Sequence, residues 1–485
     1  NSLTAFNAGS ATAGDVIYIE ETGTNYTGGI VLQNSERLFG EGHTGGANLA
    51  NVLPFTLAPN SIALPAINGT RPVITNAGGD GVALASDNIL RGFNVGACSD
   101  FGMDNIGTNS VGNLVISEVI INNTSGGGFD ASNGSGASTN VVLDALSSTG
   151  GVNGINLVGC AGTFTVNGGT ITNPTGTGVA IVNGSVVFSS SGVITDNSGF
   201  AVDIDNHDSG NATFSGNITS TGTGIRVQNC GGGTKLFSGA SKSLTTTTNA
   251  AVTLASNTGA TINITGGGLV ISTTSGTGYS ATGGGTISVT GSTNTITSTT
   301  GTAMNVANTN ISAANLTFLS ISANGAPNGI VLNTTGGSGG LSVTGSGATN
   351  GSGGTIQNIT NRGVSATSSI NLSLKNITFT NANTADGGGC GAADNSGCNA
   401  AIYMNTVTNA VMDNVDVNGA AQQGINLKEI NGFQLLNSTV INCGAGGQTE
   451  EADFYALNVF GTCEITNSSL TVPSERAAVI YNTSK

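Results

Sequence analysis

Charged side chains are scarce in this sequence. Lys, Arg, Asp and Glu make up 8% of its 485 residues, tryptophan is absent, and proline occurs only 7 times. The lack of proline excludes a collagen-like chain, although glycine is abundant. Basic residues number 11 against 26 acidic ones, so no basic stripe exists and a nucleic-acid partner is excluded. The apolar runs are also too short for a membrane span.

A short alternating pattern recurs along the chain. A small residue is followed by an apolar residue, any residue and a second apolar residue, roughly every 21 to 27 residues, with some longer steps after Ile330. Alternation with this period is typical of a parallel β-solenoid, in which each turn contributes short strands. We therefore predict an all-β fold, a parallel β-helix of about sixteen turns.

The second apolar residue of each repeat should point into the core, and the residue between the apolar pair should point outward. Each turn would bury its apolar side chains only against the turns before and after it. The predicted inward column on this strand includes Leu84, Leu157, Ile181, Ile204, Val227, Leu254, Val306, Leu332, Met404 and Leu427.

The first 75 residues differ from the repeats and are predicted to form a β cap. Strands are expected at Val16–Ile19, Ile30–Leu32 and Arg37–Phe39, within "GDVIYIEETGTNYTGGIVLQNSERLFGEG". This stretch, with the later "SDNILRGFNV", resembles the opening of pectate-lyase-like right-handed parallel β-helix proteins. Residues 76–485 are then expected to form one continuous β-helix, a fragment of a longer protein.

The resemblance implies a right-handed helix, but it leaves several functions open. The family includes polysaccharide-active enzymes, phage tailspikes and large bacterial adhesin-like surface proteins. The low-charge body, rich in Gly, Thr and Asn, is most similar to the adhesin-like group. The catalytic signatures of the family's polygalacturonase-like enzymes are missing from this sequence, and its Trp-containing lyase signature is impossible without Trp.

The first candidate site is formed by Asp203, Asp205 and Arg226. Both acids should point outward from one strand, with Arg226 beside Asp203 on the next turn. In a lyase, the two acids would hold Ca²⁺ while Arg226 approaches the α-proton of a uronate. The alternative is a surface ion pair between Asp203 and Arg226. The ion pair is favoured, because Ala180 and Val182 on the preceding turn offer no oxygen ligands.

Asp104 and Asp130 form the second candidate, at outward positions of consecutive repeats. Two carboxylates on neighbouring turns could hold a cation such as Ca²⁺. The alternative is a pair of solvated acids at the edge of a loop, and this alternative is favoured. Calcium is the only cofactor that the sequence leaves open, since the cysteines show no metal-ligand spacing.

Cys390 and Cys398 flank the short loop "CGAADNSGC" and are predicted to form a disulfide. Seven cysteines cannot all pair. Cys98, Cys160, Cys230, Cys443 and Cys463 are scattered, and most of them are expected to act as small buried apolar residues.

Residues 243–361 contain no Asp, Glu, Lys, Arg or His. Acid–base catalysis has no side chains to use there. The sequence therefore favours a non-enzymatic function: a bacterial structural or adhesive module, secreted or displayed at the cell surface. It would bind copies of itself in filaments, other surface proteins, or glycans. The alternatives are a polysaccharide lyase or glycoside hydrolase acting near Asp203, Asp205 and Arg226, and a virion fibre or tailspike-like binder.

Overall fold

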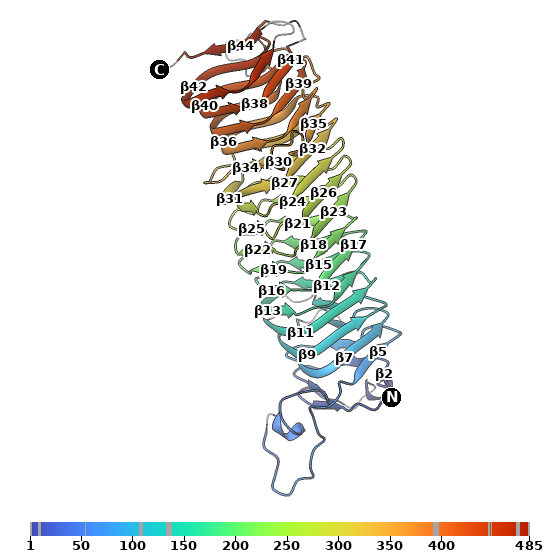
Figure 1. Ribbon diagram of the computed structural model, residues 1–485. Helices are drawn as coiled ribbons and strands as arrows, with labels where there is room; N and C mark the ends of the chain where they lie inside the picture. The colour runs from blue at the N-terminus through green and yellow to red at the C-terminus, as the bar shows by residue number, and fades with distance from the viewer. Residues whose placement is uncertain are drawn as a thin grey trace. The chain divides into compact units, whose positions relative to one another are not determined.

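The structure is a computed structural model that describes residues 2–7, 11–53, 55–105, 110–131, 138–390, 397–444, 447, 449–471 and 476–483. The chain divides into two compact units, Asn1–Gly239 (unit 1) and Ala240–Lys485 (unit 2). Each unit is a parallel β-solenoid, and together they contain about 18 turns (Figure 1). No described helix is long and apolar enough to cross a membrane.

Each turn supplies strands to three columns, of which the first carries the repeats. In unit 1 the first column contains β3 (Ile30–Val31), β6 (Val82–Leu84), β8 (Met103–Asn105), β10 (Phe129–Ala131), β12 (Asn153–Val158), β15 (Thr177–Val182), β18 (Phe200–Asp205) and β21 (Gly224–Gln228). The second contains β1 (Val16–Ile19), β4 (Arg37–Gly40), β13 (Ala161–Val166), β16 (Val187–Ser190), β19 (Ala212–Phe214) and β22 (Thr234–Phe237). The third contains β2 (Tyr26–Thr27), β5 (Val73–Asn76), β14 (Thr170–Thr172), β17 (Val193–Asp196) and β20 (Ile218–Ser220). Three long strands pass through both the second and third columns: β7 (Ile89–Cys98), β9 (Asn113–Asn123) and β11 (Ser138–Thr149).

Unit 2 repeats this plan. Its first column contains β24 (Val252–Ala255), β27 (Tyr279–Thr282), β30 (Met304–Ala307), β33 (Asn328–Asn333) and β44 (Arg476–Tyr481), and its second contains β25 (Thr261–Ile264), β28 (Thr286–Val289), β31 (Asn310–Phe318) and β34 (Leu341–Val343). Four long strands belong to both the first and the second column: β36 (Arg362–Lys375), β38 (Ala400–Asp413), β40 (Gln423–Leu436) and β42 (Ala452–Thr466). The third contains β23 (Lys242–Thr246), β26 (Leu269–Thr273), β29 (Thr295–Ser298), β32 (Ser320–Asn324), β35 (Thr355–Gln357), β37 (Thr378–Thr380), β39 (Asp416–Ala420), β41 (Thr439–Cys443) and β43 (Ser469–Thr471).

The predicted strands at the start of the chain are present, but they already belong to the solenoid. β1 pairs in parallel with β4, and β3 pairs in parallel with β6. The prediction of about sixteen turns was therefore slightly low, because it began counting at the first clear repeat.

The predicted inward column is confirmed. Its ten members are at most 5% exposed. Beside it, inward phenylalanines of the second column in unit 1 stack from turn to turn, with ring centroids 5.1–6.0 Å apart between Phe164, Phe188, Phe214 and Phe237. Such contacts add to the burial of apolar surface that holds each turn to the next.

Asparagines form the corners that follow several first-column strands of unit 1. Asn183, Asn206 and Asn229 have φ angles of 59°, 53° and 56°, the left-handed region that Asn tolerates better than most residues. The Asn206 amide donates to Oδ1 of Asn183 on the previous turn at 2.7 Å. These corners fix where each strand ends and therefore which residues face outward.

Residues 41–72 leave the solenoid between β4 and β5 and form the blue loop near the N-terminus in Figure 1. The segment contains the short helix η1 (Leu49–Asn51), and a separate four-residue helix, α1 (Thr4–Asn7), precedes β1. Leu49 and Ile67 of the segment are buried against Phe39 on the outer side of β4. The second column of unit 1 is therefore covered on its outer face at this point.

Candidate functional site

Asp203 and Arg226 lie opposite each other on β18 and β21, as predicted. The guanidinium donates twice, from Nε to Oδ1 at 2.8 Å and from Nη2 to Oδ2 at 2.7 Å. It also lies over the ring of Phe200, with Cζ 4.4 Å from the ring centroid. The hydrogen bonds to Asp203 raise the pKa of Arg226. This bidentate geometry commits both charged groups to each other.

The pair is less exposed than predicted. The predicted ion pair is present, with Asp203 only 8% exposed and the side chain of Arg226 29% exposed. The reason is local: the guanidinium of Arg226, which lies over the ring of Phe200, also binds both oxygens of the carboxylate. A partly buried ion pair contributes more to the free energy of unfolding than a solvated one, because removing one partner leaves the other charge buried without a counter-ion.

Asp205 also has partners on the next turn, but they are amides. Gln228 Nε2 donates to its Oδ2 at 2.7 Å, and Asn229 Nδ2 donates to its Oδ1 at 2.9 Å. On the preceding turn, Ala180 lies opposite Asp203 and Val182 lies opposite Asp205. The neighbouring turns thus supply amide donors and apolar side chains around the two acids, whereas Ca²⁺ requires several oxygen ligands.

Two basic residues near this patch are buried, which the sequence analysis did not predict. His207 is fully buried, and burial together with the charge of Lys235 lowers its pKa to about 4. Lys235 is also buried, and its ammonium donates to the carbonyls of Gly210 at 2.7 Å and Gly232 at 2.9 Å. Lys235 therefore stabilises a corner of the solenoid, and His207 contacts the previous turn through Nε2, which lies 3.0 Å from the Val186 carbonyl.

The second candidate, Asp104 and Asp130, also lies in register, on β8 and β10. Asp130 is 7% exposed and accepts a hydrogen bond from Asn156 Nδ2 at 3.2 Å, so it is not the solvated acid that was expected. Burial raises the pKa of Asp104 to about 7, and the nearby charge of Asp130 adds to this increase. Asp80 and Asp100 raise it further.

This acidic cluster is poor in metal-binding geometry. Within the described ranges, no group of three or more His, Cys, Asp or Glu side chains is placed to hold a metal ion. Asp80 is engaged elsewhere, since its Oδ1 accepts from the backbone N–H of Phe101 at 3.0 Å. Calcium binding by Asp104 and Asp130 stays a prediction, and a proton is the simplest group to relieve their repulsion.

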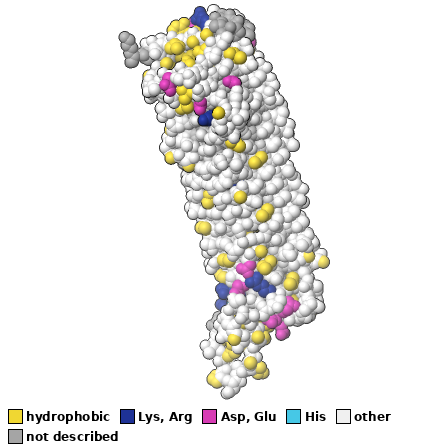
Figure 2. All heavy atoms as spheres, viewed as in Figure 1, with side chains coloured by type: hydrophobic (Ala, Val, Ile, Leu, Met, Phe, Trp, Pro, Cys, Tyr) yellow, Lys and Arg dark blue, Asp and Glu magenta, His cyan; other side chains and the backbone are white. Residues whose placement is uncertain are grey.

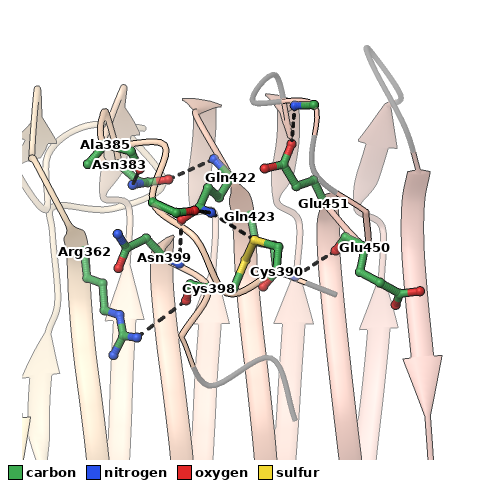
Figure 3. The surroundings of a disulfide bond; sticks show 12 residues. Arg362, Asn383, Ala385, Cys390, Cys398, Asn399, Gln422, Gln423, Glu450 and Glu451 are labelled. Carbon is green, nitrogen blue, oxygen red and sulfur yellow. Dashed lines mark hydrogen bonds between the residues drawn. A yellow bond between two sulfur atoms is a disulfide. The ribbon is translucent and has the colours of Figure 1, made fainter. Parts of the chain in front are cut away.

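The predicted disulfide between Cys390 and Cys398 is present in unit 2 (Figure 3). Gln422 contacts residues on either side of the disulfide: its Nε2 donates to Cys390 Sγ at 3.1 Å, and its Oε1 accepts from the Asn399 backbone at 2.9 Å. Gln422 is fully buried. The disulfide is therefore in contact with a buried side chain. Of the other cysteines, only Cys463 is exposed.

The uncharged stretch of the sequence corresponds to a neutral outer surface. Thr253, Ser280 and Asn305 lie in register on β24, β27 and β30. Figure 2 shows few charged side chains on the face drawn over these turns. The side chains at these outward positions offer hydroxyl and amide hydrogen bonds but no acid or base.

A pocket that the sequence analysis missed lies in unit 1, beneath residues 41–72. Arg37 of β4 and Arg91 of β7 line it together with His43. The signal was present in "ERLFG" and "ILRGFNV", where each arginine occupies an outward position beside an inward leucine. It was overlooked because the covering segment has no repeat pattern.

Comparisons with protein-family models, curated proteins and solved structures found no match for this chain. The resemblance stated above is therefore supported at the level of the parallel β-solenoid, which hosts many functions.

Proposed function

We propose that the chain is a structural or adhesive module of a surface-displayed or secreted bacterial protein. The observation that carries this proposal is the neutral outer surface of residues 243–361, where Thr, Ser and Asn side chains are stacked in register. A rigid β-face of this kind can form many weak hydrogen bonds with a glycan or protein surface. It offers no group for acid–base chemistry.

The disulfide supports a location outside the cytoplasm. Disulfides persist in oxidising compartments and are rare in the cytosol. The bond between Cys390 and Cys398 therefore fits an extracellular or cell-surface location.

Self-association is part of the proposal. β42 and β44 expose large apolar side chains: Phe460 is 46% exposed, Ile465 41% and Ile480 58%. Exposed apolar strands can pair with the strands of a second copy. Filaments or clusters of copies would form in this way.

The decisive experiment combines binding with a search for turnover. The purified chain is applied to arrays of bacterial and host glycans and incubated with uronate polymers, with and without Ca²⁺. We expect weak, multivalent surface binding that falls when Ser280→Glu places a charge on the neutral face, whereas Ser280→Asn should preserve it. No product should form. Ca²⁺-dependent unsaturated products that vanish in Asp203→Asn would instead establish the lyase alternative.

A further inference from the structure

Residues 41–72 are firmly anchored over the outer face of the second column in unit 1. His43 Nδ1 lies 2.5 Å from Glu118 Oε2, and the Thr44 hydroxyl also donates to Glu118. At the other end of the segment, the Tyr18 hydroxyl donates to the Ala66 carbonyl at 2.7 Å. The segment is therefore a fixed cover with its own apolar contacts.

Beneath this cover lies a cavity of about 280 Å³. Its walls include Phe39, Val52 and Ile89, which are apolar, and two arginines from successive turns. Arg37 lies opposite Ile89, and Arg91 lies opposite Phe39, so both arginines occupy the same outer face of the sheet. Diagonal neighbours of this kind are within reach of long side chains.

The two arginines have no counter-ion among the described residues. Arg91 Nε is buried and has no hydrogen-bond partner, and neither arginine forms a described salt bridge. Glu118 follows Ser117, which lies opposite Arg91, but its carboxylate is already bound by His43 and Thr44. Burial would raise the pKa of Glu118, but these hydrogen bonds outweigh that effect and lower it.

Two other acids form no described ion pair with these arginines. Glu36, next to Arg37 in sequence, is fully buried; its Oε2 accepts from the Gln33 backbone at 2.7 Å, and its Oε1 has no hydrogen-bond partner. Asp144 pairs with Arg71 at 2.6 Å, outside the pocket. Two guanidinium groups share a partly covered cavity, and one of them has a buried N–H without a hydrogen-bond acceptor. This arrangement lowers the stability of the fold unless an anion binds there and accepts the hydrogen bond.

We propose that this pocket binds an oxyanion carried by a small organic unit, a carboxylate or a sulfate ester on a group no larger than one sugar ring. Guanidinium forks match the geometry of both anions. The cavity is slightly smaller than most small-molecule sites, which suits a ligand of one ring, and its apolar wall suits the ring that carries the charge. The inference is independent of the proposed adhesive function.

The test is calorimetric titration of the whole chain with sodium glucuronate, glucose 6-sulfate and neutral glucose. At least one acid should bind while glucose does not, and Arg91→Met should weaken binding by about tenfold or more. The control is Arg476→Met, which removes an exposed arginine of unit 2 and should leave binding unchanged. Because Arg91 Nε is unpartnered, Arg91→Met should melt no lower than the wild type.

Two results would overturn the proposal: no binding of either acid at about 10 mM, or undiminished binding in Arg91→Met. If Arg91→Met fails to fold, the same titration is made with Arg37→Met, and undiminished binding in that variant would overturn the proposal. A second arm replaces the monosaccharides with polygalacturonate and chondroitin sulfate. Binding of both forms identifies the ligand as a unit of a polymer, and binding of the monosaccharide alone identifies it as a free small anion.

Discussion

Two pairs of residues in unit 1 occupy equivalent places and behave in opposite ways. Asp203 and Arg226 lie opposite each other on the first column, and so do Asp104 and Asp130. In the first pair the arginine binds the carboxylate through two hydrogen bonds. In the second pair two acids face each other, and burial together with the charge of Asp130 raises the pKa of Asp104 to about 7.

The difference shows how a solenoid controls charge. Stacking holds in-register side chains about 4.8 Å apart, whatever their identity. An outward carboxylate is therefore compensated by what surrounds it: an arginine for Asp203, amide donors for Asp205, and a proton for Asp104 below its raised pKa. The four predictions that follow alter one member of these arrangements at a time.

The largest effect is expected when the first pair is converted into the second. Arg226→Asp would place a third acid beside Asp203 and Asp205 and leave a buried carboxylate uncompensated. We expect a loss of about 3–5 kcal/mol in the free energy of unfolding at pH 7, partly recovered at pH 4. Urea denaturation at both pH values measures it. Arg226→Gln is the control and should lose less, whereas an equal loss in both variants would contradict the role of repulsion.

The next effect concerns pH. Because the folded pKa of Asp104 is about 7 and its ordinary value is 3.8, the folded protein holds a proton in this interval that the unfolded chain releases. Stability should therefore fall as pH rises from about 4 to 7. Asp104→Asn removes the titration, so it should gain about 2–4 kcal/mol over the wild type at pH 8 and little at pH 4. Equal pH profiles for the two proteins would contradict the raised pKa.

Removing the acid of the first pair should have a smaller effect. Asp203→Asn keeps the shape and leaves Arg226 partly exposed to water and over Phe200. We expect a loss of about 1–3 kcal/mol, measured by urea denaturation. Added salt should change this loss only modestly, because the carboxylate is buried. A loss below about 0.5 kcal/mol would mean that the pair is solvated after all.

The smallest effect is expected at Asn156, which donates one hydrogen bond to Asp130. Asn156→Ala should lose about 0.5–1 kcal/mol in a denaturant melt. Its neighbour Leu157 provides the internal scale, since Leu157 is 1% exposed and Leu157→Ala should lose about 2–5 kcal/mol. If the two losses are similar, the alternation of inward and outward residues is misassigned.

The sequence was sufficient for features that depend on period. Alternation and repeat length predict the inward column, the opposition of Asp203 and Arg226, and that of Asp104 and Asp130. The short loop between Cys390 and Cys398 likewise predicts the disulfide. Each of these relations follows from spacing along the chain.

Burial of outward residues could not be predicted in the same way. The cover over Asp203 depends on how Arg226 lies on Phe200, which is a matter of side-chain packing. The burial of Lys235 depends on two backbone carbonyls at the corners, those of Gly210 and Gly232, which accept hydrogen bonds from its ammonium. The pocket at Arg91 depends on residues 41–72, whose apolar residues follow no repeat and meet partners distant in the sequence.

The in-register stacking also has a consequence for how the protein is made. Within unit 1, β12 pairs with β10 before it and β15 after it, so each turn needs only the turn already completed as a template. Assembly can then proceed in the direction of synthesis, with each new turn docking on the finished end. A chain that emerges N-terminus first could fold while its remainder is still being synthesised, which limits the time that unpaired strands are open to misassembly.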